Sequence, residues 1–205
     1  MRPRIGFIVV IMMALCACQE PVVVKPSAML RLDYPLPKYS AMEADCPFDF
    51  FKNNWAKIGM KEGCNVILDY SQMKAALYLT YIPVTDNLSE LLFEAQKRTY
   101  DHSVRASDIV EQALIDPRRK VYGTYFTING DAATQAQFYV TDSLQHFLAG
   151  ALYFRTKPNF DSLYPAIDYI REDIKALMES FSKVLKSPGQ SFSFPIPQII
   201  TEGWL

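Results

Sequence analysis

The dipeptide Asn129-Gly130 constrains the fold of this chain more than any other feature of its sequence. Both residues tolerate the positive φ of a type I′ turn, and they stand between two segments of strand character, 121–128 and 132–140. A second tight turn, Asp142-Ser143, leads into a third such segment at 146–154. Three strands joined by short turns in this way predict an antiparallel meander.

The alternation of residues along these segments predicts how the sheet is covered. On 146–154 both alternating sets of residues are apolar, so we expect a central strand with layers on both sides. On the preceding segment Gln135, Gln137 and Thr141 alternate with apolar residues, which favours a half-exposed strand.

A long C-terminal helix is predicted to supply one covering layer. Asp161 or Ser162 can cap it, and apolar residues then recur at spacings of three and four as far as Phe181. Its charged residues are expected to form a solvated outer face; they are Arg171, Glu172, Lys175 and Glu179.

A second helix is predicted after Pro83. Asn87 can cap it with Glu90 in the capping-box position, and we expect it to end near Tyr100. The segment 107–114 is ambiguous between a short helix and a strand.

The N-terminal half has the character of short strands separated by prolines and Gly63. The predicted strands are 29–34, 48–55, 65–70 and 73–82. Pairing of the middle two, 48–55 and 65–70, would bring Cys46 and Cys64 into range of each other. The expected fold class is therefore α+β, an antiparallel meander sheet covered by a long C-terminal helix and a second helix.

The first residues have the layout of a signal peptide. Arg2 and Arg4 precede an apolar run, Ile5 to Leu15, that is too short to span a bilayer as a helix. Leu15-Cys16-Ala17-Cys18 then fits a lipobox, with Cys18 as the thiol that receives diacylglycerol and with palmitate among the expected acyl chains. The alternatives are an uncleaved membrane anchor and an ordinary secretory signal.

Cleavage before Cys18 sets the domain organisation. We expect a signal peptide at 1–17, an extended tether at 18–28, a single globular α+β domain at 29–186 and an apolar, proline-containing tail at 187–205. The tail could add a strand, dock in a groove of this protein or a partner, or remain a disordered end. The formal net charge of -1 gives no field that would attract nucleic acid.

Export changes how the remaining cysteines are interpreted. Cys16 leaves with the signal and Cys18 takes the lipid, so the mature domain holds only Cys46 and Cys64, an even pair in an oxidising compartment. A disulfide between them is the expectation, and a metal site built from two thiols without a nearby histidine is much less favoured.

The sequence carries no motif that points to catalysis. It has no glycine-rich phosphate loop, nucleophile elbow, zinc-protease helix or paired-thiol motif, and we expect neither a cofactor nor a metal. His102 beside Asp101 could be oriented for proton transfer, although a loop-bracing role is the commoner one. His146 follows Asp142 and Ser143 in a triad-like order that local geometry would not normally align.

Aromatic residues crowd onto the meander. An aromatic-lined ligand pocket is one interpretation, and a sheet core with tyrosine hydroxyls at its rim is the commoner one. The residues are Tyr122, Tyr125, Phe126, Phe138, Tyr139, Tyr153 and Phe154.

Taken together, several stretches of this sequence resemble the gliding-motility lipoproteins of the GldD type. The resemblance covers most of residues 18–182, with Cys18 and Cys46-Pro47-Phe48 at its start and its longest specific stretch from Val121 to Phe154. Within that stretch lie Asn129-Gly130-Asp131-Ala132-Ala133, Gln137-Phe138-Tyr139-Val140-Thr141-Asp142-Ser143 and His146-Phe147-Leu148; Arg171-Glu172-Asp173-Ile174 follows in the helix.

This resemblance implies a lipid-anchored protein of the bacterial cell envelope, needed for gliding and associated with type IX protein secretion. It carries over no catalytic residue, and it implies partners in the gliding and secretion apparatus and a position facing the periplasm. The layered arrangement is also similar to small binding proteins of the PsbP and Mog1 type. The expected function is a non-enzymatic accessory or assembly role; the alternatives are an envelope module that binds a small ligand or peptide, and a hydrolase using His102 or His146.

Overall fold

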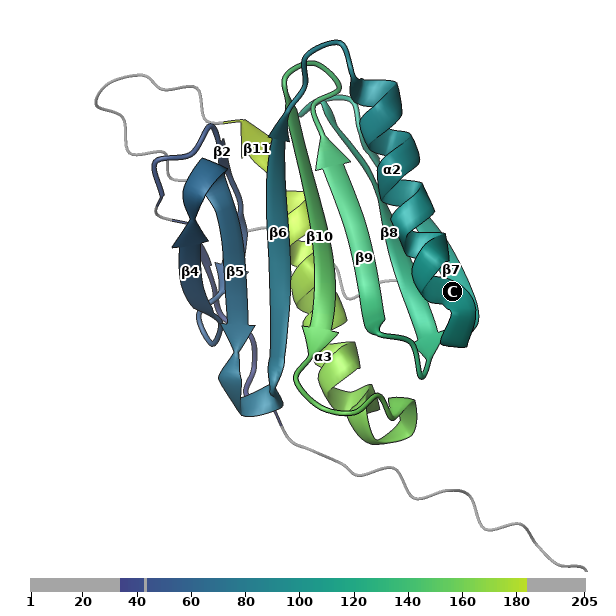
Figure 1. Ribbon diagram of the computed structural model, residues 1–205. Helices are drawn as coiled ribbons and strands as arrows, with labels where there is room; N and C mark the ends of the chain where they lie inside the picture. Colours follow the sequence, from purple (N-terminus) through teal and green to yellow (C-terminus); the bar gives the residue numbers. More distant parts are fainter. Residues whose placement is uncertain (1–33, 43, 184–205) are drawn as a thin grey trace, which may run out of the picture.

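A main β-sheet lies between two helices, so the fold has three layers (Figure 1). The computed structural model describes residues 34–42 and 44–183, apart from the side chains of His102, Ser103 and Lys183. The elements are β1 (Tyr39–Ala41), β2 (Phe48–Asp49), β3 (Phe51–Asn53), β4 (Lys57–Lys61), η1 (Glu62–Cys64), β5 (Asn65–Tyr70), η2 (Ser71–Met73), β6 (Ala75–Pro83), α2 (Leu88–Asp101), η3 (His102–Arg105), β7 (Ala106–Asp116), β8 (Val121–Gly130), β9 (Thr134–Thr141), β10 (His146–Phe154), α3 (Phe160–Ser180) and β11 (Ser182–Lys183).

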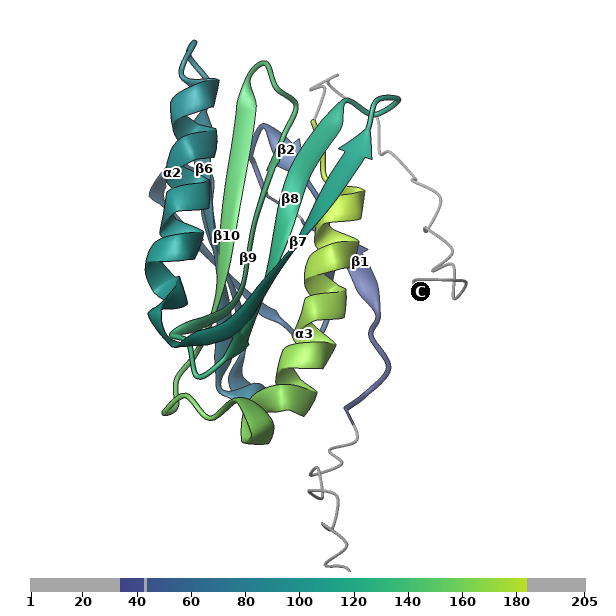
Figure 2. The ribbon, with the colours of Figure 1, turned by 90° about the vertical axis from the view of Figure 1, so that its right-hand side faces the viewer.

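The main sheet has seven antiparallel strands in the order β4-β5-β6-β10-β9-β8-β7. The meander predicted from the turns is its right-hand part in Figure 1, strands β8, β9 and β10. The ambiguous segment 107–114 belongs to β7, an edge strand paired along β8. The α+β fold class is confirmed, with α3 on one face of the sheet and α2 on the other (Figure 2).

The turn between β8 and β9 differs from the prediction. Asn129 and Gly130 are the last two residues of β8 and pair with β7, so the reversal follows them rather than using them as a two-residue turn. Of these two residues, Gly130 has a positive φ, of 100°, and Asn129 does not. A Cβ at this position would lie 2.7 Å from Ser107 N, so close approach of the β7 backbone requires glycine.

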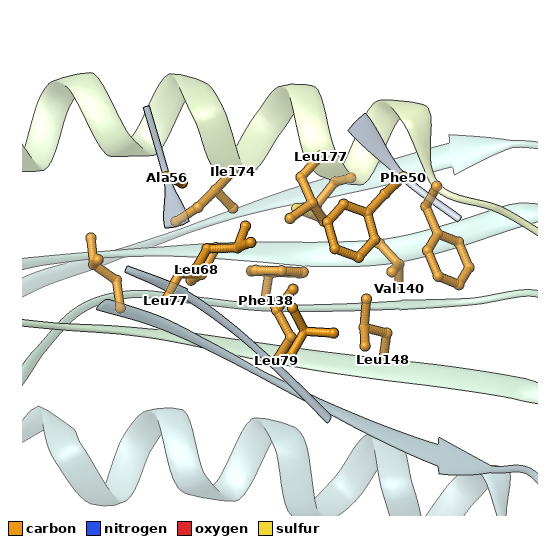
Figure 3. Close-up of a cluster of buried hydrophobic side chains, with 14 of the residues drawn as sticks. Phe50, Ala56, Leu68, Leu77, Leu79, Phe138, Val140, Leu148, Ile174 and Leu177 are labelled. Carbon is orange, nitrogen blue, oxygen red and sulfur yellow. The ribbon is translucent and has the colours of Figure 1, made fainter. Parts of the chain in front are cut away.

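Strand β10 is central, as its two apolar faces predicted. Leu148 and Leu152 are fully buried toward α3, and Phe147 is buried on the face toward α2. Figure 3 shows the core between the sheet and α3, with Ile174 and Leu177 on the helix side and Phe138, Val140 and Leu148 on the sheet side. Burying a side chain such as Leu148 or Ile174 contributes about 1.5–3 kcal/mol to the free energy of folding.

Strand β9 is not half-exposed, and that prediction was wrong. Gln135, Gln137 and Thr141 are buried, and each of these side chains makes at least one hydrogen bond within the protein. Gln137 Oε1 accepts from Thr99 of α2, and Gln135 Nε2 donates to the Ala132 carbonyl. The alternating polar residues of β9 are therefore buried side chains that form hydrogen bonds within the protein, and they do not form a solvent-exposed face.

The start of α3 lies slightly before the predicted cap. Asn159 is the N-cap, and its side chain accepts a hydrogen bond from Ser162 N at 3.2 Å. Asp161 and Ser162 are therefore in the first turn, where the negative charge of Asp161 interacts favourably with the positive end of the helix dipole. For α2, the helix begins after Asn87 as predicted, but the Asn87 side chain accepts from Thr85 N.

The predicted pairing of 48–55 with 65–70 was also wrong. The first segment forms two short strands, of which β2 pairs with β11 and β3 pairs with β1, while β5 pairs with β4 and β6 in the main sheet. The reason is packing: Phe48 and Phe50 are buried against Phe181 and the α3 side of the core. Of the predicted strand 29–34, residues before Tyr34 lie outside the described residues.

Among the described residues, no helix is long and apolar enough to cross a membrane. The signal peptide, Cys18, the tether and the tail at 187–205 lie outside the described residues.

Candidate functional site

The structure joins Cys46 to Cys64, as predicted from the even pair of cysteines. Their Cα atoms are 5.8 Å apart. The bond links the segment that precedes β2 to η1, at the corner between β4 and β5. It therefore fastens the N-terminal segment to the main sheet.

The triad-like residues build a turn between β9 and β10. The Asp142 carboxylate accepts hydrogen bonds from the backbone N–H groups of Leu144, Gln145 and His146. Burial alone would raise the pKa of Asp142, but these N–H groups hold it below its usual value. The Asp142 carboxylate therefore stabilises the backbone of the turn.

The imidazole of His146 lies beside a tyrosine. Its Nδ1 is 2.9 Å from the Tyr81 hydroxyl, and the side chain is 8% exposed. This environment is typical of a histidine that braces packing at the end of a strand. His102 begins η3 after α2, and its side chain lies outside the described residues.

Sequence reasoning missed a buried carboxylate on α3. Asp173 is 4% exposed and accepts hydrogen bonds from Asn53 Nδ2 at 2.9 Å, Tyr39 Oη at 2.8 Å and Tyr70 Oη at 3.0 Å. Burial raises its pKa above the usual value, although the three hydrogen bonds act in the opposite direction. The group ties β1, β3 and β5 to α3.

Arg171 was expected on the solvated face of α3 and is buried instead. Its Nη2 donates to the Ile128 carbonyl, the Asn129 side chain and the Gln135 carbonyl, each at 3.1 Å. Burial lowers the pKa of this guanidinium from its usual value. Its bonds hold the end of β8 and the start of β9 against the helix. Glu172 and Lys175 lie on the solvated face as predicted, and they form an ion pair there.

A trough of about 290 Å³ lies on the sheet face beside α2. Its floor consists of the small residues Thr80, Ala149 and Ala151, with Thr80 opposite Ala149 in the register between β6 and β10. In Figure 1, α2 lies over the β8 and β9 side of the sheet, which leaves the β6 and β10 side open. We call this depression the α2 trough.

Aromatic rings form the two ends of the α2 trough. At one end Tyr78 and Tyr153 meet edge to face, with ring centroids 5.8 Å apart. At the other, Tyr139 stacks on Phe147 at 5.5 Å and contacts Phe126 at 6.3 Å. Large rings at the ends and small side chains between them leave the centre of the sheet face hollow.

Helix α2 forms the long wall of the trough. Leu91 and Ala95 line it, Thr99 holds the helix to the sheet through its 3.1 Å bond to Gln137, and Arg98 stands on the rim. The volume is near the lower end, about 300 Å³, of small-molecule sites. Its mainly apolar and aromatic lining suits an extended apolar segment.

The aromatic crowding seen in the sequence belongs to two different places. Phe126, Tyr139 and Tyr153 line the α2 trough, whereas Tyr125 lies in the core on the opposite face of the sheet. Phe138 belongs to that core and also borders the trough. Alternation along each strand separates the two sets, but the depth of the trough depends on where α2 lies. Within the described residues, no group of three or more histidine, cysteine or acidic side chains is arranged to hold a metal ion.

Comparison with known proteins places the chain in a family. No match is found among curated proteins. A sequence model of the family described as "Gliding motility lipoprotein GldD" matches residues 19–182. That range includes every element of the main sheet, both helices, both cysteines of the disulfide and the whole α2 trough. The chain therefore belongs to the gliding motility lipoprotein GldD family.

Proposed function

We propose that this protein is a non-enzymatic accessory or assembly component of the gliding apparatus and of the associated type IX protein secretion machinery. The observation that carries the proposal is the family match over residues 19–182. The lipobox at Cys18 supports anchoring in the envelope by lipid, and the disulfide supports a periplasmic, oxidising environment.

The placement of the titratable groups supports a role in binding rather than chemistry. Active sites commonly gather groups with shifted pKa values in a cleft. Here Asp173 and Arg171 are buried on the inner side of α3 and bonded to the protein's own groups, on the face of the sheet opposite the α2 trough. The charged residues that line the trough are Glu94 and Arg98, both on α2.

Affinity isolation from gently solubilised envelope tests the proposal. The tagged full-length protein should co-purify with subunits of the secretion or motility machinery, identified by mass spectrometry, and Cys18→Ala should lose them because it lacks the lipid. Lys175→Met, on the exposed face of α3, is the matched control and should keep the partners. Isolation of the protein alone in all three preparations would contradict the accessory role.

Activity in cells separates this role from a hydrolase. His102→Ala and His146→Ala should restore gliding and secretion to a deletion strain as well as the unaltered chain does. Loss of both processes in either variant, with normal protein levels and an unchanged unfolding midpoint, would favour chemistry at that histidine.

The α2 trough favours a second candidate, an envelope module that binds a small ligand or a peptide. Ligands that bind only the native state raise its unfolding midpoint. A thermal-shift screen with envelope fragments should then show stabilisation that Ala151→Phe, which fills the floor of the trough, abolishes. An absence of stabilisation across the screen would count against this candidate.

A further inference from the structure

We propose that the α2 trough is the docking site for the apolar tail of the same chain, with Phe192, Phe194 and Ile196 on its floor. The proposal goes beyond the accessory role, because it names one occupant for the α2 trough, a segment of this chain itself. It is carried by the geometry of the trough and by the sequence of a segment that lies outside the described residues.

The spacing of the tail residues matches the length of the trough. Phe192, Phe194 and Ile196 alternate with Ser193 and Pro195, so an extended chain presents all three on one side. Four residue steps in an extended chain span about 13 Å. On β6 the trough runs from Tyr78 to Ile82, which is the same number of steps.

The prolines of the tail favour a sheet face over a sheet edge. Pro195 and Pro197 have no N–H to donate, so this segment is poorly suited to pairing as an additional strand. Docking through side chains onto a face requires no backbone donors. The floor of Thr80, Ala149 and Ala151 offers room for side chains rather than an unpaired strand edge.

The charges of the two surfaces are compatible. Residues 191–205 contain one charged side chain, Glu202. Arg98 on the rim makes no ion pair with a described residue, so an acidic group beside it would be favourable. Docking therefore places apolar groups on the floor without leaving a lone charge buried.

The last described residue lies within reach of the trough. Lys183 pairs with Phe48, whose ring is 5.0 Å from the ring of Tyr81 on β6. Tyr81 faces the α3 side of the same strand that presents Thr80 and Ile82 to the trough. The nine steps from residue 183 to residue 192 span up to about 30 Å, enough to pass around the end of β6.

Covalent connection favours the chain's own tail over a second copy. A segment joined by a short linker has an effective concentration in the millimolar range, well above that of another molecule offering the same residues. The docked tail would also exclude other apolar peptides from the trough.

Photocrosslinking of the full mature chain tests the proposal. Phe194 is replaced by p-benzoylphenylalanine, the protein is irradiated at low concentration, and crosslinked peptides are identified by mass spectrometry. The expected result is crosslinks within one chain to β6, β10 or α2. Crosslinks only to other elements, only between chains, or none at all would each overturn the proposal.

A matched pair of substitutions on the same sheet face makes the test specific. Ala151→Phe fills the floor of the trough and should reduce the crosslinks about tenfold, because it removes the site of one apolar side chain. Ala113→Phe adds the same ring to exposed β7, outside the trough, and should leave the yield unchanged. Equal yields in the two variants, with thermal unfolding confirming that both are folded, would overturn the proposal.

Discussion

Asn53 donates a hydrogen bond to Asp173 across 120 positions of sequence, and this carboxylate is almost completely buried. Burial raises the pKa of Asp173 in the folded protein despite its hydrogen bonds. The folded state therefore holds the proton more tightly than the unfolded chain. The stability this contributes is full below the unfolded value of about 4 and is lost as pH rises through the folded value.

The first prediction follows from the raised pKa of Asp173, which makes the folded state less stable as pH rises. Asp173→Asn removes the titration, so the free energy of unfolding of the variant should improve relative to the unaltered chain as pH rises from about 4 toward neutrality. Asp69→Asn is the control, because hydrogen bonds from Ser71 and Arg155 lower the pKa of Asp69. The Asp69→Asn variant should instead lose stability relative to the unaltered chain as pH rises, and this change should lie at and below a pH of about 4. Urea unfolding at several pH values measures both, and parallel curves for the two variants would contradict the assignment.

Loss of the buried guanidinium should be costly. Arg171→Met leaves the Ile128 and Gln135 carbonyls without this donor, and we expect a loss of about 2–3 kcal/mol in the free energy of unfolding. Lys175→Met, one turn later on the exposed face of α3, should change it by less than about 0.5 kcal/mol. Chemical denaturation of both variants compares them directly. Similar small losses would mean that Arg171 is solvated in solution.

The glycine at the end of β8 should not tolerate a side chain. Gly130→Ala forces alanine to a φ of 100° and brings its Cβ to 2.7 Å from Ser107 N, so we expect a loss above about 2 kcal/mol. Gly59→Ala on β4 has nothing closer than 3.9 Å and no positive φ. It should be neutral or slightly stabilising, and the unfolding midpoints of the two variants test this contrast.

Removal of the disulfide should destabilise the fold without changing its architecture. For cysteines 18 positions apart, loop-closure entropy gives about 3 kcal/mol. The double variant Cys46→Ser with Cys64→Ser should therefore unfold at a lower temperature, and reductant should lower the midpoint of the unaltered chain to a similar value. A midpoint insensitive to reductant would show that the bond is absent or without effect on stability.

The sequence predicted the elements whose signals are local. Alternation and turn residues identified the meander, and spacings of three and four identified α2 and α3. The pairing of Phe48 and Phe50 with elements far along the chain was missed, because it depends on the contact with Phe181. Asn159 rather than Asp161 caps α3, since either residue has the chemistry and only the path of the chain selects one.

The buried polar groups and the trough were harder to predict for the same reason. Arg171 and Glu172 have the same helical signal as neighbours on a charged face, yet only Arg171 meets the carbonyl groups of β8 and β9. Glu172 remains exposed with Lys175. Phe126 and Tyr139 belong to the aromatic group for which a sheet core was the commoner interpretation, yet both line the α2 trough. Tyr78 and Thr80 enter the trough through pairing of β6 with β10.

The disulfide also determines how the domain responds to mechanical tension applied from the N-terminal side of the chain. A pull that arrives at Tyr34 first strains the contacts of the N-terminal segment with α3, including the bond from Tyr39 to Asp173. At Cys46 the force divides, and the covalent bond carries it directly to Cys64 at the corner of the main sheet. Residues 47–63 are then shielded from extension. Only the short segment before Cys46 can be peeled away while the sheet, and the α2 trough on it, keep their shape.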